Sequence, residues 1–235
     1  KPMAESLADA EEIVRVSEET GRRYAVMQNR RYMTTIRAYR DLVRSGKLGD
    51  IGSIHASFFL GPHFGGFRDA MDSPLIVDMA IHTFDQARFI TGADPVSVYC
   101  HEYNPPGSWY KGKASAVCIF EMDNGSWCAE GLNTSWEADW RVTGSRGSAV
   151  WDGVNLPVAE AIDEAESGGF MNAFKRLDVP ASYEGRSGHE GCLEEMFASL
   201  EEDRPAETDC RDNIKSMKMV FGAVESARTG KKVLL

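Results

Sequence analysis

The chain has 235 residues, of which 43% are hydrophobic and 26% are charged, and its 36 acidic and 26 basic residues give a formal net charge of −10. This balance is typical of a globular protein and excludes a wholly disordered chain. The acidic charge excludes nucleic acid and anionic membranes as expected partners, and no apolar run approaches the roughly 20 residues that cross a bilayer. Five scattered cysteines without a C-x-x-C pair predict reduced thiols and a cytoplasmic location.

The first part of the chain predicts two helices with a short strand between them. Apolar residues recur at helical spacing through residues 6–20, and Gly21 is suited to end that helix. Residues 24–28 form a short apolar run that indicates a buried strand, and residues 34–45 have the pattern of a second amphipathic helix. A helix followed by a short buried strand is typical of the closing unit of a doubly wound sheet.

The middle of the chain predicts a strand over residues 51–60, then a loop rich in glycine and phenylalanine, then one long helix over residues 72–92. Asp72 or Ser73 is suited to cap the first turn of this helix, and Gly92 is suited to end it. Apolar residues cover most of its circumference, so we expect the helix to be largely buried.

The rest of the chain predicts an antiparallel sheet followed by helices. Asn124-Gly125 lies between two alternating runs, which is a strong hairpin signal, and a second tight turn joins residues 139–143 to residues 148–151. Residues 152–187 are irregular. The other strands and helices are predicted at residues 96–102, 115–121, 126–133, 188–202, 209–229 and 233–235. This order predicts an α+β fold: one large, open, mainly antiparallel sheet with helices on one face.

Three polar residues interrupt the long apolar helix. Asp78, His82 and Asp85 are spaced i, i+4 and i+7, which places them on one narrow stripe of an α-helix. A carboxylate one turn before an imidazole can accept its N–H, fix its tautomer and raise its basicity, as a general base requires. Two alternatives stay open, namely a satisfied core histidine and half of a metal site. Asp85 is expected to be structural, pairing with an arginine or capping a backbone group.

Four stretches of the chain carry a recognisable pattern. They are Lys1-Pro2-Met-Ala, Ser45-Gly-Lys-Leu-Gly-Asp-Ile-Gly52, Asp78-x-x-x-His82-x-x-Asp85, and the ending from Thr208 through Ser226-Ala-Arg-Thr-Gly-Lys-Lys-Val233. Their order resembles the Gfo/Idh/MocA family, the relatives of glucose-fructose oxidoreductase and inositol dehydrogenase. The Asp/His helix together with the Lys-Pro start is the most specific part of this resemblance.

The resemblance implies two domains. Residues 1–29 would be the last helix-strand unit of an N-terminal dinucleotide-binding (Rossmann) domain, and residues 30–235 a C-terminal substrate-binding and oligomerisation domain. The chain has no G-x-G-x-x-G turn, which such a nucleotide domain carries. We therefore expect the chain to be the C-terminal portion of a longer enzyme, with NAD or NADP bound mainly by the absent half, and the fragment alone to be inactive.

The chemistry that the resemblance implies is NAD(P)-dependent hydride transfer between a nicotinamide cofactor and a sugar, polyol or related hydroxy compound. His82 would take the hydroxyl proton, and Asp78 would orient His82. Lys1 would hold the same oxygen and, with Pro2, contact the cofactor. This set is chemically sensible, because a base beside a cation that steadies the developing alkoxide lowers the barrier to alcohol oxidation.

The substrate contacts expected besides Asp78 and His82 are Asn29 and Arg30. They follow the predicted strand at the end where doubly wound sheets bind ligands, although they could equally be solvated loop residues. The rival to an oxidoreductase is a non-catalytic ligand sensor on the same fold, which needs neither a base nor its orienting acid. A metal enzyme is less favoured, since no third and fourth ligand lie at short spacing, and no metal is expected.

The expected partners are a small-molecule substrate and further copies of the chain. Four apolar residues lie on the predicted strands, namely Val117, Ile119, Trp127 and Leu132. A large open sheet with helices on one face leaves its other face to be covered. The sequence therefore predicts a homodimer or homotetramer that packs through its sheet faces.

Overall fold

The computed structural model of the chain describes residues 1–59, 63–133, 137–168 and 171–235, with the backbone alone for 130–133 and 137–138. The helices are α1 (Leu7–Thr20), α2 (Thr34–Arg44), α3 (Ile81–Thr91), α4 (Gly188–Glu201) and α5 (Cys210–Thr229). The strands are β1 (Ile51–Phe59), β2 (Pro95–Tyr103), β3 (Ser115–Met122), β4 (Trp127–Asn133), β5 (Glu137–Gly144), β6 (Gly147–Trp151), β7 (Val158–Ile162), β8 (Phe174–Leu177) and β9 (Val233–Leu234). In the described part of the chain, no helix is both long and apolar enough to cross a membrane.

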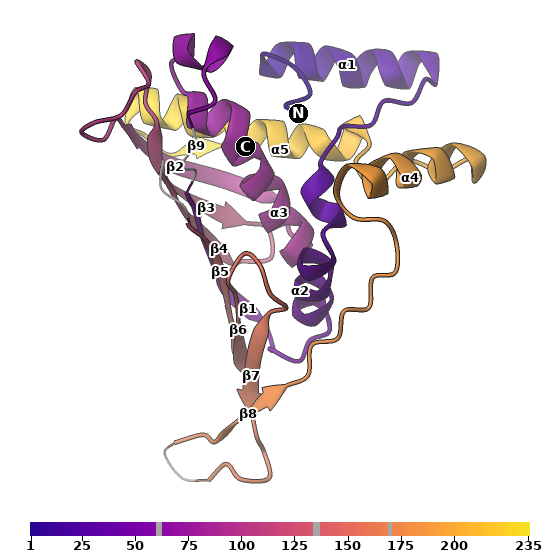
Figure 1. Cartoon of the computed structure of the whole chain (residues 1–235), viewed down its shortest axis with the longest axis vertical. Coiled ribbons are helices and arrows are strands. Elements are labelled where there is room, and N and C mark those ends of the chain that lie inside the picture. The colour runs from indigo at the N-terminus through magenta and orange to yellow at the C-terminus, as the bar shows by residue number, and fades with distance from the viewer. Residues whose placement is uncertain (60–62, 134–136, 169–170) are drawn as a thin grey trace.

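The strands form one mixed sheet of nine strands in the order β8-β7-β6-β5-β1-β4-β3-β2-β9. Figure 1 shows this sheet nearly edge-on, with the helices on one of its faces, which confirms the predicted α+β class. The pairing of β1 with β4 is parallel, and the other pairings of the described strands are antiparallel. Both predicted hairpins are confirmed, β3–β4 and β5–β6, and Gly125 in the first turn has a φ of 79° that suits glycine.

The sequence did not reveal strands β7 and β8, and the prediction of an irregular segment over residues 152–187 is wrong to that extent. Strand β7 has five residues and pairs with β6, and the four-residue β8 pairs with β7 at the edge of the sheet. Runs this short carry little pattern of their own. The neighbouring strand stabilises them, and a single sequence does not show that neighbour.

The long helix of residues 72–92 begins differently from its prediction. Its first six residues, Leu75–Ala80, form a π-helical turn, and the α-helix α3 begins at Ile81. Ser73 does not cap the helix, because its hydroxyl donates to Glu102 Oε2 at 3.0 Å. Gly92 ends α3 with a φ of 74°, as predicted. Residues Ile81–Ile90 are all buried between the sheet and the outer helices, as expected for an element apolar on most sides.

The N-terminal segment packs against the other helices rather than into a sheet. Helix α1 lies beside α5 (Figure 1), and Ala25 forms an isolated β-bridge with Asp209 just before α5. The predicted strand over residues 24–28 is therefore reduced to this bridge, because a strand needs a neighbour along its length to satisfy its backbone groups. The division into domains at residues 29 and 30 stays a prediction.

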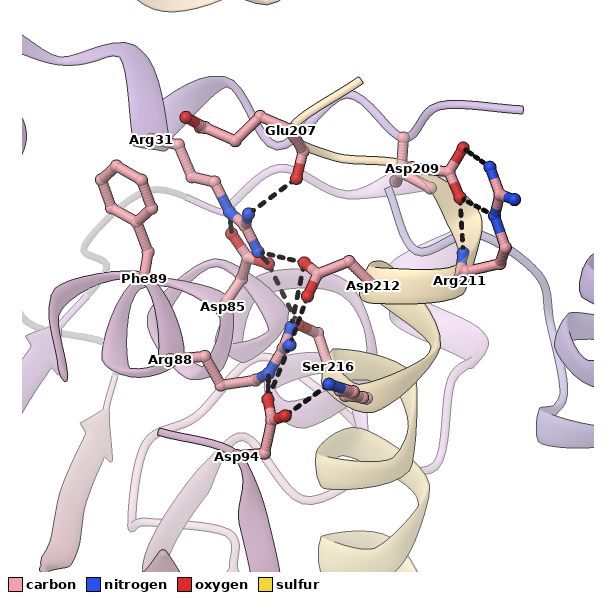
Figure 2. Close-up of polar contacts among 12 residues, drawn as sticks. Arg31, Asp85, Arg88, Phe89, Asp94, Glu207, Asp209, Arg211, Asp212 and Ser216 are labelled. Carbon is pink, nitrogen blue, oxygen red and sulfur yellow. Dashed lines mark hydrogen bonds and ion pairs between the residues drawn. The ribbon is translucent and has the colours of Figure 1, made fainter. Parts of the chain in front are cut away.

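A buried ion-pair network fixes α3 against α5. Figure 2 shows Arg31 donating to both carboxylate oxygens of Asp85, at 2.6 and 2.7 Å, and to Asp212 at 3.0 Å. Arg88 donates in turn to Asp94 and Asp212. The prediction that Asp85 is structural and pairs with an arginine is confirmed. The network holds in place the helix that carries His82.

Candidate active site

The site predicted from the sequence lies at the start of the long helix, where Lys1 meets the π-helical turn. Lys1 Nζ donates to the backbone oxygen of Asp78 at 2.5 Å and lies 3.4 Å from Asp78 Oδ1. On the other side, Arg68 Nε donates to Asp78 Oδ2 at 2.5 Å. Two cations from different parts of the chain thus form ion pairs with the same buried carboxylate.

Asp78 does not orient His82, so this part of the prediction is wrong. Both carboxylate oxygens of Asp78 are engaged by Lys1 and Arg68, and the buried Nδ1 of His82 has no hydrogen-bond partner among the described residues. The Asp78 carboxylate is paired with these two cations instead, in the π-helical turn that begins the long helix.

His82 is a buried, neutral imidazole. It lies in the first turn of α3, in a stretch that is buried throughout, and 7% of the residue is exposed. Burial is the main cause that lowers the pKa of His82 to about 2, and the positive charges of Arg30 and Lys1 lower it further. Burial also lowers the pKa of Lys1, although Asp78 raises it in part. The site therefore combines a neutral imidazole with positively charged side chains.

Arg30 reaches the same site from the turn Asn29–Tyr32. Its guanidinium lies over the ring of Phe58 at the end of β1, 4.5 Å from the ring centroid. It forms no hydrogen bond or ion pair with the described residues, and burial lowers its pKa to about 10. Because its charge affects the pKa of both His82 and Lys1, Arg30 lies within electrostatic range of both groups. Asn29 is half-buried beside it.

Arg68 is a site residue that the sequence did not reveal. It lies in a short 3₁₀ turn, Gly66–Ala70, and its guanidinium packs over Phe67 at 4.5 Å. In the same loop His63 Nε2 lies 2.7 Å from Asp69 Oδ1, and its ring packs against Trp109 with a centroid distance of 5.2 Å. A composition rich in glycine and phenylalanine marks this segment as a loop, but no spacing within it points to Asp78.

Sequence and structural comparisons place the chain among known proteins. Residues 36–150 match the GFO/IDH/MocA C-terminal domain. Over 99% of its length the chain is 26% identical to the uncharacterized protein y4oX of Sinorhizobium fredii, of which it covers 68%. Over 54% of its length it is 32% identical to D-apiose dehydrogenase of Rhizobium rhizogenes, of which it covers 37%.

The fold is also found in solved structures. An oxidoreductase from Agrobacterium radiobacter, solved in complex with NAD+, L-tartaric acid and magnesium, superimposes with a TM-score of 0.81 at 24% identity. That alignment covers 100% of this chain and 71% of the other. The sequence match, the nine-stranded sheet and the Asp/His helix agree. Residues 36–150 of the chain therefore belong to the GFO/IDH/MocA C-terminal domain family, and the described chain as a whole shares the fold of the Agrobacterium radiobacter oxidoreductase.

Proposed function

We propose that this chain supplies the substrate-binding and catalytic groups of an NAD(P)-dependent oxidoreductase that transfers hydride between a nicotinamide cofactor and a sugar, polyol or related hydroxy compound. The observation that carries the proposal is a buried neutral imidazole, His82, within electrostatic range of Lys1, whose Nζ is held by Asp78 one turn away on the same long helix. The relative named D-apiose dehydrogenase and the solved relative that holds NAD+ support the same class of reaction.

The proposed roles follow from the geometry. His82 accepts the hydroxyl proton as the alcohol becomes a carbonyl, because its neutral imidazole can take up a proton. Lys1 steadies the oxygen as negative charge develops on it, and Asp78 positions Lys1 for that contact. A nicotinamide ring supplies the hydride acceptor when it is bound.

The residues of the site fit the reacting end of the cofactor rather than its phosphates. A base and a cation are what hydride transfer from an alcohol requires. The sequence contains no G-x-G-x-x-G turn to bind a pyrophosphate. We assign the phosphates of NAD or NADP to a nucleotide-binding domain outside these 235 residues, and Lys1 and Pro2 to the nicotinamide end. A cytoplasmic location stays a prediction.

The test is turnover by the protein at its natural full length. Purified protein is assayed at 340 nm with NAD+ and with NADP+ against a panel of sugars, polyols and hydroxy acids. His82→Ala should lower kcat by roughly 10²- to 10⁴-fold, since it removes the general base. His55→Ala, an exposed histidine on β1, serves as the matched control and should leave kcat unchanged.

Two results would contradict the proposal. The first is a His82→Ala variant that stays within a few-fold of the parent at every pH. The second is ligand binding without reduction of either nucleotide, which would favour the rival reading of a ligand sensor on the same fold.

A further inference from the structure

The geometry points to a substrate that carries a carboxylate, bound by the guanidinium of Arg30 while His82 and Lys1 act on a hydroxyl of the same molecule. This inference rests on the proposed function and narrows its substrate class to hydroxy acids, such as aldonates and uronates. It goes beyond the general sugar or polyol that the family suggests.

The charges at the site are unbalanced. Lys1 and Arg68 share the single carboxylate of Asp78, so neither of them has an acid to itself. Arg30 has no acidic partner among the described residues, and the neutral His82 brings no negative charge. Arg30 is half-buried, and a cation withdrawn from water without a partner is destabilising, so a ligand carboxylate would offset that cost.

The buried arginines of the chain differ from the half-buried Arg30 in their partners. Arg31, the next residue, is paired with Asp85 and Asp212. Arg37 is paired with Glu207, and Arg88 with two aspartates. The fold therefore pairs buried guanidinium groups with its own carboxylates elsewhere, and it leaves Arg30 unpaired at the one place where the candidate catalytic groups meet.

The position of Arg30 suits a carboxylate. Its guanidinium carbon lies over the ring of Phe58, 4.5 Å from the centroid, and no hydrogen bond joins its N–H groups to the described residues. The planar fork of an arginine matches the two oxygens of a carboxylate and binds them through two parallel hydrogen bonds. A neutral hydroxyl offers one acceptor and no charge, so it would leave most of this capacity unused.

A bound carboxylate would also act on His82. Besides burial, the side-chain charges that lower the pKa of this histidine are those of Arg30, Lys1 and His189. A carboxylate on Arg30 cancels part of this positive field and raises the pKa of His82 towards the range in which a base works well. On oxidation the O–H proton moves to His82, the C–H bond breaks with transfer of hydride to the nicotinamide, and a C=O bond forms.

The experiment compares each acid with its neutral twin, the uncharged analogue that has a hydroxymethyl group in place of the carboxylate. Calorimetric titrations at constant ionic strength use D-gluconate against D-glucitol and D-glucuronate against D-glucose, with the parent protein at natural full length. The variants are Arg30→Gln, Arg30→Lys and, as a matched control, Arg176→Gln, an exposed arginine on β8. Circular dichroism and thermal unfolding check that each variant folds.

We expect the parent to bind at least one acid at least tenfold more tightly than its twin. Arg30→Gln should abolish this preference, Arg30→Lys should keep part of it because the charge remains, and Arg176→Gln should change nothing. The inference is overturned if acids and twins bind equally or not at all, or if the preference survives Arg30→Gln.

Two further measurements distinguish a substrate carboxylate from the phosphates of the cofactor, and they test this inference separately from the proposed function. If Arg30→Gln weakens binding of NAD+ or inorganic pyrophosphate and the acids show no preference, Arg30 serves the phosphates of the cofactor and the inference is wrong. Turnover of neutral sugars with equal kcat/KM in the parent and in Arg30→Gln would uphold the oxidoreductase and overturn the carboxylate. Acid binding that depends on Arg30 but gives no turnover would uphold the carboxylate site and overturn the oxidoreductase.

Discussion

Among single residues, Asp78 decides how the charges of the site are distributed. Its carboxylate accepts from Arg68 on one oxygen and lies near Lys1 on the other, so it neutralises part of two positive charges at once. His82 is left without a carboxylate partner and stays neutral. The acid therefore pairs with the cation that would bind the reacting oxygen and not with the base.

A second buried acid, Glu102, should make the stability of the fold depend on pH. It lies on β2, where Ser73 donates to Oε2, while the buried Oε1 has no partner among the described residues. Burial is the main cause that raises the pKa of Glu102 to about 7. The folded state therefore binds a proton more tightly than the unfolded state does. The destabilisation is fully present above pH 7 and disappears as the pH falls towards about 4.3, the value of an unfolded glutamate.

We predict that Glu102→Gln is more stable than the parent above pH 7, by about 1–3 kcal/mol, and equally stable near pH 4.5. Urea unfolding at intervals between pH 4.5 and 8.5 measures this difference. The difference between variant and parent must be used, because the lowered pKa of His82 acts in the opposite direction over the same range. Glu160→Gln, on the exposed side of β7, is the control and should show no such dependence. A constant offset at all pH values would contradict the prediction.

Between elements, the ion pairs of Arg31 connect the turn Asn29–Tyr32 with α3 and α5. Arg31 and Asp85 are both almost fully buried, and Ser216 on α5 donates to the same carboxylate at 3.0 Å. Burial by itself would lower the pKa of Arg31, but Asp85, Asp212 and Glu207 raise it above its ordinary value. Because Arg30 is the neighbour of Arg31, this network also fixes the backbone that presents the proposed carboxylate-binding guanidinium.

We predict that Asp85→Ala destabilises the fold by about 3 kcal/mol or more, because it leaves a buried guanidinium with fewer partners. The double variant Asp85→Leu with Arg31→Met should recover much of this loss, since it removes both charges and keeps the volume. Urea unfolding measures the free energies. Arg15→Met, which breaks exposed pairs on α1, is the control and should change stability little. A loss in the double variant as large as the sum of the two single losses would refute the coupling.

For the whole molecule, the sheet face opposite the helices carries a group of exposed apolar side chains. Along β3 the buried residues alternate with Val117 and Ile119, which are exposed on the face opposite the helices, and Trp127 begins the adjacent strand β4 and is also exposed. The side chain of Leu132, the fourth residue of the prediction, lies outside the described residues. Tyr99 on β2 lies directly opposite Ile119 in the sheet register and is exposed beside it. An apolar sheet face of this kind is typical of a protein interface.

We predict that the protein is a homodimer or homotetramer that buries this face. Light scattering coupled to size exclusion should give twice or four times the subunit mass at micromolar concentration, and Ile119→Glu with Trp127→Glu should give the monomer. Val154→Glu, at an exposed valine in a loop, is the control and should leave the assembly intact. A monomer mass for the parent protein would contradict the prediction.

Local sequence determined most of the elements of this protein. Alternating runs around Asn124-Gly125 were enough to predict a hairpin, because turn geometry and strand period are both local properties. Gly92 was recognised as the end of α3 for a similar reason, since only a left-handed residue continues the chain there without strain. The order of these elements and the Asp/His helix together were also enough to indicate the family.

The tertiary structure decided which side chains meet. Whether Asp78 pairs with His82 or with Lys1 depends on a cation 77 residues away along the chain, and the spacing of Asp78 and His82 does not show that contact. The short strands β7 and β8, the bridge at Ala25 and the role of Arg68 depend on long-range contacts in the same way. Spacing along a helix predicts which residues lie next to one another on that helix, but the free energy of a buried charge depends on every group packed around it.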